Sequence, residues 1–373
     1  MIYADNAATT KLNNKAFEAM KPYFLEEYGN PSQPYSFSRT TKKALKESRE
    51  IIASCIGASP EEIFFTSGGT ESDNWVIKGN VIGNKEKKTV ITSAIEHHAI
   101  LRPCKVIADM GCPVTYMMPT EFGEITPEVL KKHISNSSQL VSIMFVNNEI
   151  GTIQPIKELC EITHSHGGLF HTDAVQAVGH ININVRDLGV DFLSASAHKF
   201  NGPRGVGFLY ISNCAYIAPF MHGGLQESGL RAGTENVALI VGMATALKEN
   251  IDCLEENRQF INDLEKEFFD ALNSSGVIYQ RNGVNQMPGI ISLSFPSKSG
   301  EAILHRLDLK GVYISTGSAC DSKNTEISHV LKAIQLNNDL AEGTIRISFG
   351  CNNTKEEARI VAKELIKIVK SKL

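Results

Sequence analysis

One lysine stands where an amine could react with an aldehyde. Lys199 follows a histidine in the segment SASAHKFNGPR, residues 194–204, which comes after the apolar stretch 190–193 and leads into a Gly-Pro loop. A lysine amine whose pKa is lowered by burial can form an imine with an aldehyde cofactor. A solvated surface lysine is the alternative interpretation, and this segment alone does not exclude it.

Three other segments supply what such a cofactor needs beside its lysine. Asp173 ends an apolar strand and could hold a ring nitrogen protonated, or it could cap a following helix. Gly69 and Thr70 lie between the strand-like residues 63–65 and a helical stretch from residue 72, where backbone N–H groups can bind a phosphate. A plain glycine turn is the alternative. His97 could stack on the ring, although a lone histidine is more often structural. Together these segments fit pyridoxal phosphate.

The order of these segments, together with further motifs, carries a family resemblance. The chain resembles the cysteine desulfurases of the NifS/IscS group, among the fold-type I pyridoxal-phosphate enzymes, over nearly its whole length. The motifs that carry the resemblance are YADNAATT (3–10), GNPS (29–32), TSGGTESDN (66–74), VNNEIG (146–151), HTD (171–173), AHK (197–199), HGG (222–224), RAGTEN (231–236), STGSAC (315–320) and RIS (346–348).

The resemblance implies a full set of site residues. Pyridoxal 5'-phosphate would be bound as a Schiff base to Lys199, and His97 would stack on the ring and act as an acid or base. The implied cofactor-binding residues are Gly69, Thr70, His97, Asn148, Asp173, Gln176, Ser196, His198, Lys199 and, from a neighbouring subunit, Thr234. The implied substrate-binding residues are Asn30, Asn148 and Arg346. An arginine fork matches a carboxylate in two-point fashion, whereas a surface ion pair is the alternative for Arg346.

The resemblance also makes Cys320 the nucleophile. Its neighbours are small and polar and include a glycine, as in an exposed loop, and Lys323 could favour the thiolate while Asp321 would oppose it. The implied reaction takes sulfur from L-cysteine, releases L-alanine and leaves a persulfide on Cys320. No bound metal is implied beyond a transient iron–sulfur contact at Cys320. Histidines 164, 166 and 171 could be mistaken for a metal cluster, but residues two apart on a helix do not face each other.

The fold expectation comes from alternating strand-like and helix-like segments between residues 63 and 210. Strands are predicted at 140–146 and 168–171, with a helix at 155–165. This alternation predicts a mostly parallel sheet with helices on both faces and catalytic groups at the strand ends. The resemblance specifies a seven-stranded sheet in a fold-type I transferase.

Two domains are expected in the 373 residues. The large, cofactor-binding domain is predicted at 15–255. The smaller α+β domain is predicted from 1–14 and 256–373, and it carries the cysteine loop at about 314–328.

Composition limits the setting of the reaction. The net charge of −4 gives no general attraction to nucleic acid, and no apolar run is long enough to span a membrane. Eight cysteines without framework spacing fit a reducing compartment, and we expect a cytoplasmic location. The resemblance implies a homodimer and a sulfur-accepting protein partner.

Alternatives remain open for activity and pathway. A selenocysteine lyase, another β-lyase or an aminotransferase of similar fold is one, although a plain aminotransferase needs no nucleophilic thiol. A partner-dependent sulfur-delivery component of a complex is the second. The acceptor could serve iron–sulfur cluster assembly, tRNA thiolation or DNA phosphorothioation. The chain ends 27 residues after Arg346, and residues 321–326 differ from the common family pattern, so the acceptor is the least specified feature, although His329 matches.

Overall fold

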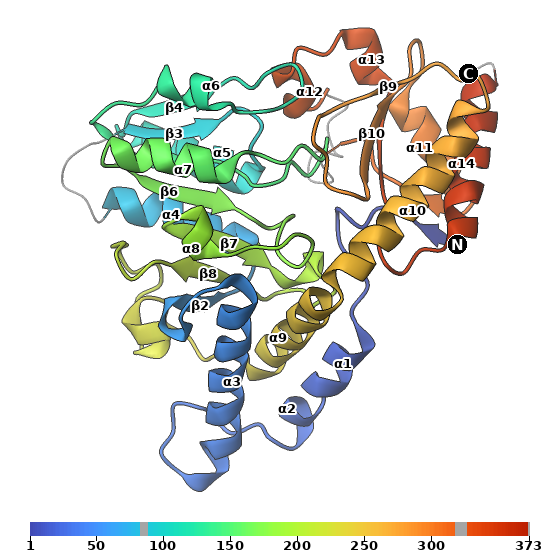
Figure 1. The fold of residues 1–373 in the computed structure, drawn as a ribbon. Helices are drawn as coiled ribbons and strands as arrows, with labels where there is room; N and C mark the ends of the chain where they lie inside the picture. Colours follow the sequence, from blue (N-terminus) through green and yellow to red (C-terminus); the bar gives the residue numbers. More distant parts are fainter. Residues whose placement is uncertain (83–88, 318–326, 372–373) are drawn as a thin grey trace.

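A seven-stranded sheet forms the centre of the computed structural model, which describes residues 1–82, 89–317 and 327–371 (Figure 1). The strands, in spatial order, are β2 (Ile63–Thr66), β8 (Gly207–Ile211), β7 (Phe192–Ser196), β6 (Leu169–Asp173), β5 (Ser138–Ser142), β3 (Thr89–Ser93) and β4 (Val114–Met117). Strand β8 is antiparallel to both of its neighbours, and the other pairs are parallel. The predicted fold class, a mostly parallel α/β sheet, is confirmed.

The two faces of this sheet follow from the alternation of side chains along each strand. One face packs against α4 (Gly69–Ile82) and α5 (His98–Asp109) through Val90, Leu140, Phe192 and Leu209. The residues that follow these four, Ile91, Val141, Leu193 and Tyr210, belong to the core on the other face, with α3 (Arg39–Ile56), α7 (Ile156–Ser165) and α9 (Val237–Asp252). Continuous apolar strands are therefore buried on both sides, as expected for a parallel sheet.

A second core lies beside this sheet, at the right of Figure 1, where both chain termini are found. Its strands are β12 (Thr344–Ser348), β10 (Ile290–Ser294) and β9 (Gln280–Arg281) in one sheet, and β1 (Ile2–Tyr3) with β11 (Val312–Tyr313) in another. Its main helices are α10 (Leu254–Asn273), α11 (Gly300–Asp308) and α14 (Lys355–Lys370). The N-terminal strand thus pairs with a segment more than 300 residues away in the chain.

The two cores are connected by consecutive helices that meet at Cys253. Buried residues of α9 belong to the first core and those of α10 to the second. The division into domains at residues 255 and 256 stays a prediction.

The remaining elements are α1 (Asn14–Met20), α2 (Pro22–Leu25), α6 (Pro127–Lys131), α8 (Val185–Leu188), α12 (His329–Ala333), α13 (Asn338–Glu342), η1 (Ser36–Ser38), η2 (Pro60–Glu62), η3 (Ala197–Lys199) and η4 (Gln226–Gly229).

Strand β5 ends four residues before the predicted residue 146. The N–H groups of Ile143 and Phe145 still donate to β6, but that of Met144 donates to the buried Glu96 carboxyl in place of a strand. Among the described helices, none has the length and apolar character needed to cross a membrane.

Candidate active site

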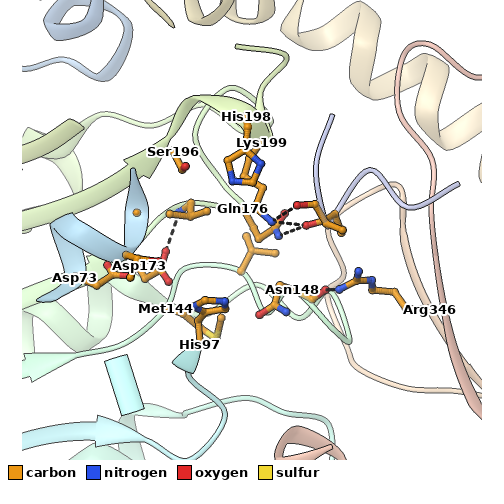
Figure 2. Close-up of a pocket in the computed structure, with 16 residues that line it drawn as sticks. Asp73, His97, Met144, Asn148, Asp173, Gln176, Ser196, His198, Lys199 and Arg346 are labelled. Atoms are coloured by element: carbon orange, nitrogen blue, oxygen red, sulfur yellow. Dashed lines mark hydrogen bonds between the residues drawn. The ribbon is translucent and has the colours of Figure 1, made fainter. Parts of the chain in front are cut away.

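A cavity of about 230 Å³ opens at the carboxyl ends of the parallel strands. It brings together ten of the residues expected from the sequence: Gly69, Thr70, His97, Asn148, Asp173, Gln176, Ser196, His198, Lys199 and Arg346. Figure 2 shows Asp173 and Arg346 on opposite sides of the view, with Lys199 and Asn148 between them. The strand ends therefore place these separate motifs around one space.

Lys199 ends the short η3 turn that follows β7. Its ammonium donates to the carbonyl oxygens of Ala7 (2.5 Å) and Ala8 (3.0 Å), which belong to the N-terminal segment. The Lys199 carbonyl is itself within 2.9 Å of His180 Nε2. The amine is therefore held at a defined position on the cavity wall.

Asp173 is the last residue of β6 and is only 5% exposed. Its Oδ1 accepts a hydrogen bond from Val175 N at 2.9 Å, but a turn and not a helix follows, so the helix-cap interpretation is wrong. Burial raises the pKa of Asp173, while the Val175 N–H and the Lys199 cation act in the opposite direction. Gln176 donates to the Ala7 carbonyl at 2.8 Å. The Asp173 carboxyl and the Gln176 amide thus line the same cavity as Lys199.

The glycine turn before α4 forms a cradle. A Cβ at Gly69 would lie 2.5 Å from Val175 Cγ2, and one at Gly68, where φ is +144°, would lie 3.3 Å from Ser196 Oγ. The backbone can approach these neighbours because both residues are glycine. Helix α4 begins at Gly69, earlier than the predicted residue 72, so its first N–H groups point toward this cradle. The Glu71 carboxylate in this first turn is paired with Arg231 at 2.7 Å.

Two histidines flank the cavity. His97 is the N-cap of α5, and its Nδ1 accepts from Ala99 N at 3.1 Å, so the neutral ring carries its proton on Nε2. His198 Nδ1 lies 3.1 Å from Thr9 Oγ1. Burial, with the Lys199 and Arg204 cations, lowers the pKa of His198 to about 4, so this ring is neutral near pH 7.

Arg346 reaches the cavity from β12 of the second core and is only 2% exposed. Its guanidinium binds Asp5 at 2.7 Å and donates to the Asn148 carbonyl at 2.8 Å. Its buried Nε has no hydrogen-bond partner within the described part of the chain. The surface ion-pair interpretation is therefore wrong, because the guanidinium is buried and both of its terminal nitrogens are already hydrogen-bonded.

Comparison with known proteins places the chain in a family. The family model described as aminotransferase class-V matches residues 2–361. The chain belongs to this family. A relative, the cysteine desulfurase IscS of Dictyoglomus turgidum, is 48% identical over 99% of this chain and 94% of its own length.

Solved structures agree with this assignment. A NifS-like protein superposes with a TM-score of 0.93 at 37% identity, over 99% of both chains. A structure described as SspA in complex with cysteine has a TM-score of 0.85 at 34% identity, over 95% of this chain and 100% of that one. Class-V aminotransferases depend in general on pyridoxal phosphate, and the resemblance noted in the sequence is confirmed.

The residues present fit the cofactor of this family. The glycine cradle, the Thr70 and Ser196 hydroxyls and the α4 N-terminus offer donors to a phosphate. A buried carboxyl oxygen of Asp73 has no hydrogen-bond partner in the described ranges, and Asp173 lies beside it. Donors for a phosphate and acids for a protonated ring nitrogen are the groups that this cofactor requires.

Two expected site residues do not line the cavity, and a third is not among the described residues. Asn30, in the loop between α2 and η1, accepts from Ser32 N at 2.9 Å and does not line the cavity. Thr234 is exposed, in the segment between η4 and α9, and likewise does not line it. Cys320 lies outside the described residues. The roles of all three stay predictions.

Asp73 is a cavity residue that sequence reasoning missed. It is 1% exposed, and its Oδ1 lies 3.7 Å from His171 Nε2. Burial, and then the neighbouring Asp173, raise the pKa of Asp73 well above its usual range. One signal could have found it, because Asp73 stands four residues after Gly69 and therefore on the same helix face as the cradle.

The histidines considered as a metal cluster have separate surroundings. His164 Nε2 lies 2.8 Å from Asp191 Oδ2. His171 is buried between the hydroxyls of Ser142 (2.8 Å) and Ser194 (3.0 Å), and burial lowers its pKa to about 3. Within the described residues, no three or more histidine, cysteine or acidic side chains are grouped to hold a metal ion.

Proposed function

We propose that the protein is a pyridoxal-phosphate-dependent cysteine desulfurase. In this proposal L-cysteine is converted to L-alanine, and the sulfur remains on Cys320 as a persulfide. The observation that carries the proposal is the meeting of Lys199, Asp173 and Gly69, the second glycine of the cradle, in one cavity. The full-length similarity to cysteine desulfurases supports the choice of reaction.

The residues that would hold the cofactor surround this cavity. Gly69, Thr70, Ser196 and His198 would hold the phosphate, and Asp173 would hold the ring nitrogen, with Gln176 and His97 at the ring. When bound, pyridoxal phosphate supplies an aldehyde for Lys199 and a ring that accepts the electron pair released at the substrate carbon. The buried acid next to the ring nitrogen would stabilise the positive charge that this electron uptake requires.

Lys199 is suited to move a proton at the substrate Cα. Its amine is fixed at the cavity wall by the Ala7 and Ala8 carbonyls, whose hydrogen bonds it must give up when it reacts. The neutral His97 carries its proton on Nε2 and can serve as a second acid or base. Two groups of complementary chemistry thus face one substrate position.

Arg346 is the group best placed for the substrate carboxylate. Its charge is buried against Asp5, and Asn148 connects it to the cavity. A substrate carboxylate would compete with Asp5 for the guanidinium, so substrate binding would also change the contacts of the N-terminal segment. Asn30 stays part of the proposed substrate site, although it does not line the cavity.

The sulfur step requires a thiolate. The Cys320 thiolate attacks the sulfur of L-cysteine, an S–S bond forms as the C–S bond breaks, and the electron pair passes to the carbon fragment. After protonation that fragment leaves as alanine. The persulfide is then passed to a sulfur-accepting protein. The proposal includes a homodimer, in which Thr234 reaches the phosphate of the neighbouring subunit, and a reducing cytoplasmic setting.

The test is alanine release from L-cysteine with added pyridoxal phosphate and a thiol reductant. Wild type should release alanine, Cys320→Ala should retain the cofactor absorption but lose turnover, and Lys199→Ala should lose both. Equal alanine release by wild type and Cys320→Ala would reject the persulfide step. The same assay with L-selenocysteine separates the lyase alternative, which predicts turnover that does not need the thiol.

A further inference from the structure

We propose that Glu149 is a positioning residue that holds together the two ends of the segment carrying Cys320. This inference rests on the role proposed above for Cys320. It concerns the described residues on either side of that segment, Gly317 and Ser328, which are separated by ten residues in the chain.

The Glu149 carboxylate accepts a hydrogen bond from one end and lies close to the other. Ser328 Oγ donates to Glu149 Oε2 at 2.5 Å, and Glu149 is only 3% exposed. A Cβ at Gly317 would lie 3.3 Å from the same Oε2 and 3.7 Å from Ser328 Cβ. Gly317 has φ of +141°, a backbone conformation in which a residue other than glycine would be strained. The backbone at Gly317 therefore passes directly against the carboxylate and against Ser328.

The C-terminal end is the stronger of the two attachments. Ser328 is the N-cap of α12, and its hydroxyl accepts from Val330 N at 3.1 Å while donating to Glu149. A hydrogen bond to a buried carboxylate is charge-assisted and about twice as strong as a neutral one. One hydroxyl thus connects the start of α12 to Glu149.

Glu149 is itself held by its own turn. Asn147 Oδ1 accepts from the N–H groups of Glu149 (2.9 Å) and Ile150 (3.0 Å), and Asn147 Nδ2 donates to the Ile95 carbonyl at 3.0 Å. Asn147 is fully buried, and Gly151 completes the turn with φ of +75°. The carboxylate therefore projects from a rigid base, which is what a positioning residue needs.

The same base contacts the proposed substrate site. Asn148, next to Glu149, lines the cavity and accepts from Arg346 through its carbonyl at 2.8 Å. Ser315, two residues before Gly317, exchanges backbone hydrogen bonds with Arg346 (3.0 and 2.6 Å). Residues on both sides of the cysteine segment are therefore attached to groups that would contact substrate.

Further contacts connect the C-terminal end to Glu96 and His98, the residues on either side of His97. His329 Nε2 lies 2.9 Å from the Glu96 carbonyl, and its ring centroid is 4.8 Å from that of His98. The ends of the segment are thus fixed relative to Arg346, Asn148 and His97. Fixed ends restrict the volume that a tethered thiol can explore and so raise its effective concentration at the substrate sulfur.

The experiment compares Ser328→Ala, Ser328→Thr and Glu149→Gln in the full-length holoenzyme. Ser299→Ala is the matched control, because Ser299 is also an N-cap serine, accepting from Ala302 N at 3.2 Å, but it contacts α11 instead. Four quantities are measured: kcat and KM for alanine release, the cofactor absorption, and the rate at which iodoacetamide alkylates Cys320. The exposed Cys214 provides an internal reference for alkylation by mass spectrometry.

Ser328→Ala should lower kcat about tenfold, the scale of one charge-assisted hydrogen bond, while KM and the cofactor absorption stay unchanged. Alkylation of Cys320 relative to Cys214 should become faster. Ser328→Thr, which keeps the hydroxyl, should restore the wild-type kcat and the wild-type alkylation rate of Cys320. Glu149→Gln should give values between those of wild type and Ser328→Ala, and Ser299→Ala should match wild type.

Two results would overturn the inference. One is wild-type kcat and Cys320 alkylation in both Ser328→Ala and Glu149→Gln. The other is loss of cofactor absorption in step with kcat, which would place the effect in the cofactor site. Failure of the proposed function is seen separately, because Cys320→Ala would then still release alanine.

Discussion

The buried carboxyl of Glu96 gives a prediction with a calculable size. Glu96 lies three residues after β3 and is fully buried, and it accepts from Ser93 Oγ at 2.5 Å and from Met144 N at 3.0 Å. Burial is the largest effect on its pKa, which is raised to about 8; the two donors oppose the shift, and the nearby Asp173 adds to it. Glu96→Gln keeps the shape and the acceptor oxygen but removes the titration.

The sign follows from the raised pKa. Between pH 4.5 and pH 8 the folded protein retains a proton that the unfolded chain releases, so the free energy of unfolding falls as pH rises through this window. Wild type should lose about 2.5 kcal/mol between pH 5 and pH 7 from this group. With an unfolding entropy of about 2.1 cal/mol/K per residue, the corresponding change in Tm is about 3 °C.

The assay is thermal unfolding of wild type, Glu96→Gln and the exposed control Glu121→Gln at pH 5 and pH 7. The Tm of Glu96→Gln minus that of wild type should increase by about 3 °C between the two pH values, whereas the control difference should stay constant. Parallel behaviour of all three proteins would mean that Glu96 is ionised when folded. In that case the donors from Ser93 and Met144 outweigh burial, and the reasoning above is refuted.

Two other predictions concern the phosphate side of the site. Gly69→Ala should weaken pyridoxal-phosphate binding in a cofactor titration, because its Cβ would overlap Val175 and force one of the two to move; an unchanged affinity would show that the cradle can adjust. His198 should remain neutral at pH 6 in an NMR titration of the cofactor-free protein, because burial with Lys199 and Arg204 lowers its pKa to about 4, and a midpoint near its usual value would contradict this.

The sequence was sufficient to predict the site residues at the carboxyl ends of two strands. Asp173 ends β6 and Lys199 lies three residues after β7, and parallel strands bring such positions to one edge. The end of β5 could not be predicted in the same way, because Ile143 to Val146 are as apolar as the strand before them. What ends the strand is the carboxyl of Glu96, which takes the Met144 N–H, and that contact exists only after β3 and β5 pair.

Residues whose role depends on both cores were the hardest to foresee. Arg346 was expected to bind the substrate carboxylate, but its contact with Asp5 was not foreseen, because it depends on a backbone bridge between β12 and the N-terminal segment. Glu149 reads in the sequence as one more polar residue of a turn. Its carboxylate matters only because Ser328, far away in the chain, folds onto it.

This difference has a physical origin that also limits how the enzyme can be altered. Positions fixed by local pattern, such as Gly69, are determined by the strand and helix that contain them. The roles of Asp73 and Glu149 depend instead on the groups that tertiary folding brings to their buried carboxyls. One Asp73 oxygen has no hydrogen-bond partner in the described residues, and Glu149 accepts from Ser328. A buried carboxyl is costly unless its proton or its hydrogen bonds are provided, so each such residue requires a compensating group nearby. Ser328 supplies such a hydrogen bond to Glu149, whereas Asp73 lies beside a second acid, Asp173, which raises the pKa of Asp73 and so favours its protonated form.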